Sequence, residues 1–397
     1  MDNNHDKLFA NQLILNPVEN LPYLFYSRTL DDIEGLYITD KNRTEEEKKK
    51  SKILFGGRQK YIDEVLYTYD LWKKHLHADD ITLRPFSGLN AHMLLFLSLG
   101  SVGDTVLLLP EIAGGHYATS GILNRLGYRI EYLPVDIENR CINTDKAIQM
   151  IRNNNYQFLF IDRSEGINFE DFSEIATAFN GLKIFDASQY LSNILFEDFQ
   201  SPFKWGFDII LSTLHKNFPG PQKALLCTND KNNYYWKKIQ TTMKDCISNI
   251  HAHQILQSGL VLTDKRLPLY AHEMLANSLK LENAMLELGV DIEPKKEFLP
   301  PTHHIWIKCK DYEDAYNAYK NLEKNNILVN YRKLPYEIGY GLRLGTSAAT
   351  LQGLTIENCK VIASIIAKSI HGVICTNYVK SIIYNMYEES KYANNRF

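Results

Sequence analysis

Short apolar segments alternate with amphipathic segments along the first half of the chain. Between Tyr61 and His77 the apolar residues recur at helical spacing, which predicts a helix with one buried face. Five later apolar runs have the length of buried strands, and the segments between them fit helices. These runs are Thr105–Leu109, Arg129–Leu133, Gln157–Ile161, Leu182–Phe185 and Asp208–Leu211. Such alternation predicts an α/β fold with a mostly parallel sheet covered by helices.

The last third of the chain has a different pattern and predicts a second, smaller unit. A long helix is expected from Tyr270 to about Gly289, followed by strands at His303–Ile307 and Ile327–Val329. Between these strands, Tyr312–Leu322 fits a helix whose N-terminus Asp311 caps. The predicted organisation is an N-terminal arm at 1–60, a large domain at 61–265 and a small α+β C-terminal domain at 266–397.

Composition excludes several classes of protein. The net charge is −3 over 397 residues, whereas a general nucleic-acid binder has a basic excess. The first residues lack the basic and apolar parts of a signal peptide, and no apolar run is long enough to span a membrane. The six cysteines are scattered without C-x-x-C spacing, which argues against a zinc site or a disulfide framework. We therefore predict a cytoplasmic protein without a metal site.

A lysine and a carboxylate follow two consecutive predicted strands. Lys216 comes after the run that ends at Leu211, where partial burial would favour the neutral amine. A neutral amine can form a Schiff base with an aldehyde, although the lysine alone would fit a surface loop equally well. Asp186 ends the preceding strand. Pyridoxal phosphate uses this pair, because a carboxylate keeps its ring nitrogen protonated while a lysine holds its aldehyde.

Three further motifs fit the same cofactor and an amino-acid substrate. Ser87-Gly88 precedes an apolar helical run, and a helix N-terminus offers N–H groups to a phosphate. A Gly-Gly pair precedes His116 and lets the backbone approach a ligand closely. Arg343 lies on a predicted strand before a Gly-Thr turn, where a guanidinium can bind a carboxylate through two hydrogen bonds. Taken singly, these residues would also fit helix capping, packing or a surface ion pair.

Together the motifs resemble those of serine hydroxymethyltransferase, a fold type I pyridoxal-phosphate enzyme of the aspartate aminotransferase superfamily. The resemblance runs from about Leu15 to about Leu354. Its strongest motifs are Ser87-Gly88, Gly114-Gly115-His116, Asp186-Ala187, Thr213-Leu214-His215-Lys216 with Gly220-Pro221, and Leu342-Arg343-Leu344-Gly345-Thr346. The resemblance implies a fold type I architecture and transferase or lyase chemistry on a small amino acid.

The resemblance also implies roles for the matching residues. Lys216 would hold the cofactor, Asp186 would contact its ring nitrogen, and His116 would stack on its ring. Further cofactor contacts would come from Ser87, Gly88, Ser164, Gln189, Thr213 and His215, and substrate contacts from Arg343, Glu34 and Phe55. Glu34 is the expected acid–base residue. In the family it reaches the active site of a neighbouring subunit, so a homodimer with shared active sites is expected.

Several positions depart from the family pattern. The replacements are Val18, Asp32, Phe55, Gln189 and Gln222. The segment between Val329-Asn330 and Gly341 is also shorter than the family loop that supplies an asparagine to folate. These departures favour a specialised aldolase or transaldolase that cleaves or transfers the Cα–Cβ bond of serine, threonine or glycine without tetrahydrofolate.

Three alternatives stay open at this stage. The first is a folate-dependent hydroxymethyltransferase, and the second is a decarboxylase, racemase or C–S lyase on the same scaffold. The third is a non-catalytic relative that serves as a binding or assembly subunit. That last alternative would be expected to lose Lys216 or Asp186, and the chain retains both.

Overall fold

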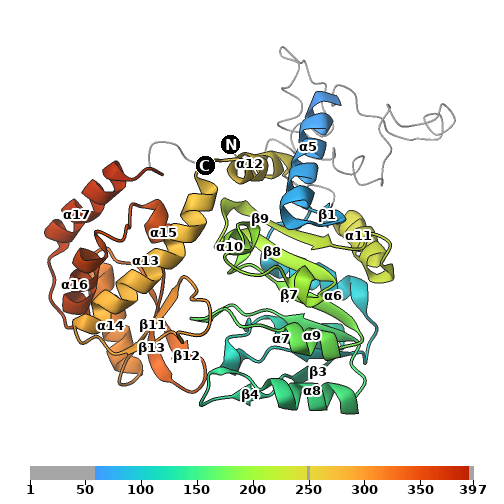
Figure 1. Cartoon of the computed structure of the whole chain (residues 1–397), viewed down its shortest axis with the longest axis horizontal. Helices are drawn as coiled ribbons and strands as arrows, with labels where there is room; N and C mark the ends of the chain where they lie inside the picture. Colours follow the sequence, from blue (N-terminus) through green and yellow to red (C-terminus); the bar gives the residue numbers. More distant parts are fainter. Residues whose placement is uncertain (1–58, 248–250, 393–397) are drawn as a thin grey trace.

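A computed structural model of the chain describes residues 59–247 and 251–392 (Figure 1). The predicted arm at 1–60 therefore lies almost entirely outside the described residues. Glu34 and Phe55, the two predicted site residues in that arm, also lie outside them. Their roles stay predictions.

The larger of two main sheets is mostly parallel, as the sequence predicts. Its strands lie in the order β1 (Asp80–Thr82), β9 (Pro219–Thr228), β8 (Ile209–His215), β7 (Leu182–Asp186), β6 (Phe158–Ile161), β2 (Thr105–Leu108) and β3 (Arg129–Tyr132). All neighbours from β8 to β3 are parallel, whereas β9 is antiparallel to both β8 and β1. Each predicted strand of this region is present in the sheet.

The central strands of this sheet are buried on both faces. All four residues of β6 are buried, and so are the first six of β8. Helices therefore have to cover both faces, which explains why these strands consist of unbroken apolar runs. The helices of this unit are α5 (Gln59–Leu76), α6 (Gly88–Leu99), α7 (Thr119–Leu126), α8 (Thr144–Asn153), α9 (Ser173–Ala178), α10 (Leu191–Leu195), α11 (Tyr234–Cys246) and α12 (Ala252–Leu262). A short hairpin of β4 (Val135–Asp136) and β5 (Cys141–Ile142) lies beside them.

The smaller sheet is antiparallel and lies in the orange and red part of Figure 1. Its strand order is β10 (Ile292–Glu293), β11 (His304–Lys308), β13 (Gly339–Gly345) and β12 (Asn330–Leu334). Helices α14 (Tyr312–Lys324), α15 (Thr346–Leu351), α16 (Cys359–Ile370) and α17 (Thr376–Glu389) belong to the same unit. Asp311 caps α14 as predicted, because its carboxylate accepts a hydrogen bond from the Asp314 N–H.

One predicted strand is misplaced. Residues 327–329 are apolar, yet they are not in a strand, and β12 begins at Asn330 instead. The register explains the shift, since pairing between the two strands starts with Asn330 opposite Arg343. Ile327 and Val329 pack against the small core without pairing, while Leu328 is exposed. Apolar character here reflects core packing rather than a place in the sheet.

Helix α13 (Leu267–Glu287) joins the two units, and the sequence predicts a long helix in this region. Near its start, the Ala271 carbonyl accepts a hydrogen bond from the Asn193 amide of α10. Farther along, the Asn277 amide donates to the Leu354 carbonyl of the smaller unit. The helix therefore contacts both units along its length.

In the part of the chain that the structure describes, none of the helices combines the length and the apolar character that a membrane crossing requires.

Candidate active site

The carboxyl ends of β7 and β8 hold the two residues that the sequence singles out most clearly. Asp186 ends β7, where it pairs in register with Leu211 of β8. Its Oδ1 accepts a hydrogen bond of 2.8 Å from the Ser188 N–H, and the Ser188 hydroxyl accepts one of 2.9 Å from Thr213 N–H. These contacts fix the carboxylate at the edge where ligands bind in parallel sheets.

Asp186 is held in its ionised form by its surroundings. Burial alone would raise its pKa, but a hydrogen bond from His92 and the charges of His92 and Lys216 lower the pKa to about 2. The His92 Nε2 lies 2.7 Å from Asp186 Oδ2. At neutral pH this site therefore presents a carboxylate to any ligand beside it.

Lys216 follows the end of β8. Its charge lowers the pKa of Asp186, His116 and His215, so its ammonium lies near all three side chains. The sequence predicts a partly buried lysine, whereas Lys216 is exposed in the described part of the chain. The expected desolvation is therefore not observed there.

His116 lies next to a backbone segment that only glycine can form. A Cβ on Gly114, whose φ is +86°, would lie 2.0 Å from the Glu165 carbonyl oxygen. A Cβ on Gly115 would lie 2.3 Å from the Leu109 carbonyl oxygen. The His116 ring is half-buried, and burial together with the charge of His92 lowers its pKa to about 4. His116 is therefore a neutral ring beside Asp186 and Lys216.

The Ser87-Gly88 turn begins helix α6, as the sequence predicts, and packs against β8. The Ser87 hydroxyl caps the helix by accepting a hydrogen bond from Asn90 N–H. A Cβ on Gly88 would lie 2.7 Å from the Thr213 Cγ2, so a larger residue would not fit without a shift. The Thr213 hydroxyl is buried and has no hydrogen-bond partner among the described residues. A helix N-terminus beside an unsatisfied hydroxyl suits an anionic group.

The remaining predicted cofactor residues surround the same edge. Ser164 lies beside the glycine segment, because its N–H donates to the Gly114 carbonyl oxygen at 2.8 Å. Gln189 is buried in the turn after β7. The His215 Nδ1 lies 3.3 Å from the Lys223 carbonyl oxygen, and burial lowers the pKa of His215.

Arg343 projects from β13 toward the loop after β6. Its Nη1 lies 3.3 Å from Oε1 of Glu165, the residue that follows Ser164, and its Nη2 donates to Asn330 Oδ1 at 2.9 Å. Arg332 also forms an ion pair with Glu165. The smaller unit thus brings two guanidinium groups to one buried carboxylate at the edge of the site.

A family model described as serine hydroxymethyltransferase matches residues 11–366 of the chain. The chain belongs to the serine hydroxymethyltransferase family.

Curated relatives agree with this assignment, and a solved structure shares the fold. A serine hydroxymethyltransferase from Saccharolobus islandicus is 28% identical over 89% of this chain and 84% of its own length. One from Aeropyrum pernix is also 28% identical, over 78% and 73%. The structure of L-threonine transaldolase from Pseudomonas fluorescens in its internal aldimine state has a TM-score of 0.78. It is 23% identical and covers 84% of this chain and 78% of its own, so it shows the shared fold.

As a member of the serine hydroxymethyltransferase family, the protein has the fold of the fold type I enzymes and is a pyridoxal-phosphate-dependent enzyme of the transferase or aldolase type. Pyridoxal phosphate fits the residues present. Gly88 leaves room that a Cβ would fill, and the buried Thr213 hydroxyl lacks a partner among the described residues. Asp186 is an ionised buried carboxylate of the kind that the ring nitrogen requires.

Three residues near the candidate site are not predicted from the sequence. His92 is a single histidine within an apolar helix, and its spacing alone suggests core packing. Glu165 and Arg332 pair across two units, and no local pattern reveals that contact. An acidic residue directly after Ser164 is a sequence signal for this contact, and it is a weak one.

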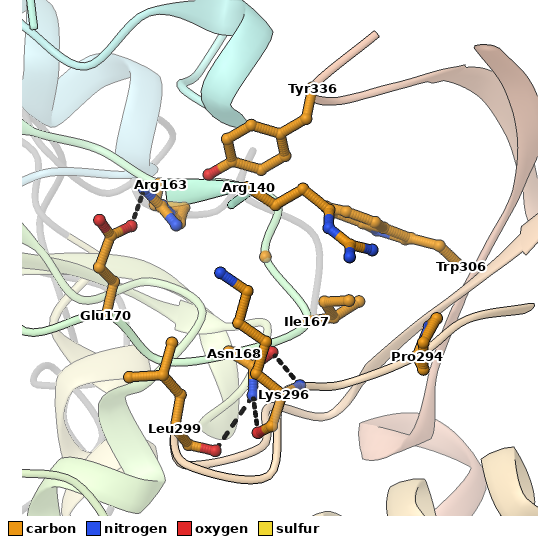
Figure 2. Close-up of a pocket in the computed structure, with 11 residues that line it drawn as sticks. Arg140, Arg163, Ile167, Asn168, Glu170, Pro294, Lys296, Leu299, Trp306 and Tyr336 are labelled. Carbon is orange, nitrogen blue, oxygen red and sulfur yellow. Dashed lines mark hydrogen bonds and ion pairs between the residues drawn. The ribbon is translucent and has the colours of Figure 1, made fainter. Parts of the chain in front are cut away.

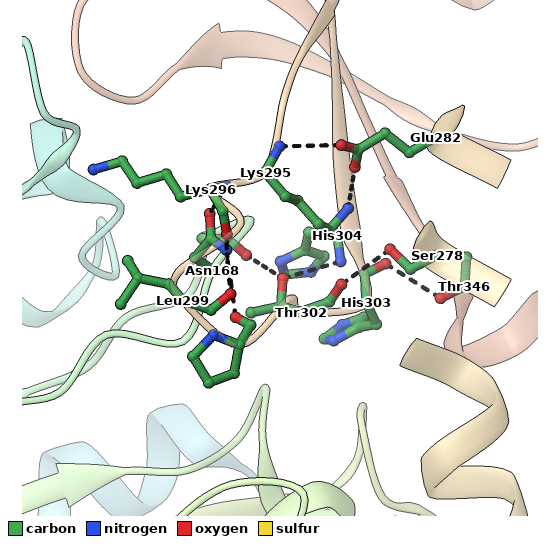
Figure 3. Close-up of polar contacts among 12 residues, drawn as sticks. Asn168, Ser278, Glu282, Lys295, Lys296, Leu299, Thr302, His303, His304 and Thr346 are labelled. Carbon is green, nitrogen blue, oxygen red and sulfur yellow. Dashed lines mark hydrogen bonds and ion pairs between the residues drawn. The ribbon is translucent and has the colours of Figure 1, made fainter. Parts of the chain in front are cut away.

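The junction of the two units lies beside the candidate site. Figure 3 shows the Asn168 amide facing the loop of residues 296–300. Its Nδ2 lies 3.1 Å from the Leu299 carbonyl oxygen, and its Oδ1 accepts from the Lys296 N–H at 2.9 Å. Nearby, Lys295 and Glu282 form a buried ion pair within the smaller unit. These contacts fix the loop that leads into β11, the neighbour of the strand that carries Arg343.

A separate pocket opens at this junction (Figure 2). Arg163, paired with Glu170 at 2.5 Å, and Lys296 line it together with Trp306 and Tyr336. None of the predicted cofactor or substrate residues that the structure describes lines this pocket. Among the described residues of the chain, no three His, Cys, Asp or Glu side chains gather closely enough to hold a metal ion.

Proposed function

We propose that this enzyme cleaves or transfers the Cα–Cβ bond of serine, threonine or glycine without tetrahydrofolate. The observation that supports folate independence is the short connection between β12 and β13, which consists of residues 335–338. Tyr336 and Glu337 both have positive φ, near 56° and 58°, so the chain reverses within a tight turn. Tyr336 is buried, and its N–H donates to the Ile112 carbonyl oxygen at 2.6 Å.

This turn leaves little chain for a folate contact. The family resemblance implies a longer loop here, with an asparagine that reaches the folate. In this chain the turn lies against the segment before His116, since Ile112 accepts its hydrogen bond. A side chain committed to this packing is not available to bind a pterin ring.

The cofactor residues would act through charge and shape. Pyridoxal phosphate, when bound, supplies a ring that accepts electrons from the substrate Cα. Asp186 would face the ring nitrogen as an anion, because its pKa is about 2. His116 would lie against the ring in its neutral form, because its pKa is about 4, and a neutral imidazole is less costly to desolvate than a charged one. Lys216 would hold the aldehyde carbon covalently.

The phosphate and the substrate carboxylate would bind at opposite ends of the site. The N–H groups at the start of α6, the Ser87 hydroxyl and the Thr213 hydroxyl would hold the phosphate. Arg343 would bind the α-carboxylate of the amino acid through its guanidinium. Anchoring both ends would place one Cα bond perpendicular to the ring, and in this family that bond is Cα–Cβ or, for glycine, Cα–H.

The likeness to a threonine transaldolase supports threonine as a donor for the proposed reaction. Glu34 would supply the acid–base group from a neighbouring subunit, so we propose a homodimer in the cytoplasm. Folate-dependent serine hydroxymethyltransferase is the second candidate, because that is the activity named for the curated relatives.

A donor and acceptor assay tests the proposal. Purified protein with pyridoxal phosphate would receive L-threonine and an aromatic aldehyde in one reaction, and L-serine with tetrahydrofolate in another. We expect acetaldehyde release from threonine and a new β-hydroxy amino acid, with no stimulation by tetrahydrofolate. Lys216→Ala should abolish both products, whereas Lys204→Ala, at an exposed lysine in the same unit, should leave them unchanged. Activity that requires tetrahydrofolate would establish the second candidate instead.

A further inference from the structure

A chain of buried polar groups runs behind Asp186. The His92 Nε2 lies 2.7 Å from Asp186 Oδ2, and its Nδ1 lies 3.3 Å from the Thr119 hydroxyl. That hydroxyl lies 2.6 Å from Oδ2 of Asp162, at the end of β6. All four residues are buried, and they come from four separate segments of the polypeptide. Together they form a line of polar contacts that ends at Asp186, the candidate ring-nitrogen carboxylate.

Counting hydrogen-bond donors and acceptors leaves two arrangements of the protons in this series of side chains at neutral pH. If Asp162 is ionised, it accepts the Thr119 proton, and the Thr119 oxygen then accepts from Nδ1–H of His92. His92 also donates its Nε2–H to Asp186, so it is an imidazolium. If Asp162 is protonated, it donates to Thr119, Thr119 donates to Nδ1, and His92 is neutral. The two arrangements contain the same protons.

The surroundings of the chain do not supply another partner for the shared proton. Burial raises the pKa of Asp162 to about 7, opposed by His92 and Thr119, and Asp186 raises it further. The backbone N–H of His116 also faces Asp162, and the Asp162 Oδ1 has no partner among the described residues.

On its other sides His92 meets aromatic rings. The His116 ring is edge-on at 5.7 Å and the Phe160 ring at 5.1 Å. Beyond Asp186, the nearby charged group is Lys216. A change of protonation at Asp162, Thr119 or His92 therefore acts mainly on the charge of Asp186.

The geometry points to His92 as a positioning residue for Asp186, with one proton shared between Asp162 and His92 through the Thr119 hydroxyl. This inference rests on the proposed role of Asp186 at the cofactor. When the Asp162 O–H bond breaks, its proton passes to the Thr119 oxygen, and the Thr119 proton passes to His92 Nδ1. The resulting imidazolium balances the negative charge of Asp186, whereas neutral His92 leaves that charge for the ring nitrogen.

Nitrogen NMR of histidine tests the relay in the full-length protein, with and without pyridoxal phosphate. The signals missing from His92→Asn assign His92. In Asp162→Asn the imidazolium loses its carboxylate, so we expect the midpoint of the His92 titration to fall by at least one pH unit. Thr119→Val keeps the shape of the side chain without the hydroxyl and should shift the midpoint in the same direction. Ser98→Ala removes a buried hydroxyl from α6, the helix that carries His92, and should not shift the midpoint.

The cofactor gives the second measurement. The dissociation constant of pyridoxal phosphate, measured against pH, should change with the same midpoint as the His92 signals in each variant. The relay would be overturned if the midpoint of the His92 titration stays within 0.2 pH unit of the wild-type value in both Asp162→Asn and Thr119→Val. If the wild-type protein binds no pyridoxal phosphate, the proposed function fails, while the histidine titration still decides whether the relay exists.

Discussion

At the scale of single residues, the site depends on buried charges whose partners lie far away in the sequence. Asp162 accepts a hydrogen bond from Thr119, which lies 43 residues away in the sequence. Glu165 pairs with Arg332 and Arg343 from the smaller unit. Substitution of these acids therefore tests whether the buried charges shape the site.

The first residue-scale prediction concerns Asp162. Burial raises its pKa to about 7, so the folded protein keeps a proton that the unfolded chain loses above 3.8. The free energy of unfolding should therefore fall as pH rises across this window, by up to about 1.4 kcal/mol per pH unit. Asp162→Asn should lack that slope. Urea unfolding at several pH values measures it, and parallel pH profiles for the two proteins would contradict the prediction.

The second concerns Glu165, which is buried and competes for Arg343 in the absence of substrate. Glu165→Gln removes that negative charge, so a substrate carboxylate should bind Arg343 more tightly. We expect the dissociation constant of glycine to fall by about three- to tenfold, which corresponds to roughly 1 kcal/mol. Absorbance titration of the cofactor-loaded protein measures it, with Glu111→Gln as an exposed control. Weaker glycine binding by Glu165→Gln would show that Glu165 instead orients Arg343.

Sequence alone predicts the positions of Asp186, His116 and Arg343 at strand ends and glycine turns, because local patterns mark those places. It does not predict His92, since a histidine at a buried helical position cannot be told from a packing residue. The burial expected at Lys216 is not observed in the described residues. Side-chain burial depends on all neighbouring segments, which a local sequence pattern does not specify.

At the scale of elements, the contact between α6 and β8 shapes the predicted phosphate site. Gly88→Ala would place a Cβ 2.7 Å from the Thr213 Cγ2, closer than carbon atoms approach. We expect the dissociation constant of pyridoxal phosphate to rise by about tenfold, which is about 1.4 kcal/mol.

The double variant Gly88→Ala, Thr213→Ser is the matched control for this prediction. Serine keeps the hydroxyl of Thr213 and removes the methyl group that clashes. Cofactor binding should therefore recover most of the wild-type affinity in a fluorescence titration. Equal affinity for the wild-type protein and the single variant would show that this contact does not shape the site.

The central strands of the large sheet are predictable from sequence because they are apolar on both faces and separated by helices. The same reasoning fails at residues 327–329, where apolar residues pack on the small core next to the first paired position, Asn330. Strand pairing is a non-local property, and a short apolar run does not reveal where pairing begins.

At the scale of the whole molecule, the junction between the two units positions Arg343 relative to the cofactor residues. Asn168 joins them, because its amide bonds the backbone of Lys296 and Leu299. Asn168→Ala would remove this partner from the Leu299 carbonyl and the Lys296 N–H, both on partly buried residues, at a cost of about 1–3 kcal/mol. Urea unfolding should show this loss, whereas Asn155→Ala, at an exposed asparagine, should not change stability. Unchanged stability in Asn168→Ala would mean that other contacts hold the junction.

The central claim is that Lys216 carries the cofactor beside Asp186. Borohydride reduction of the cofactor-loaded protein, followed by peptide mass spectrometry, tests it most directly. We predict that the pyridoxyl phosphate mass is found on the peptide containing Lys216, and that Lys216→Ala acquires no label. Label on another lysine, such as Lys223, or no label on the wild-type protein would contradict the account.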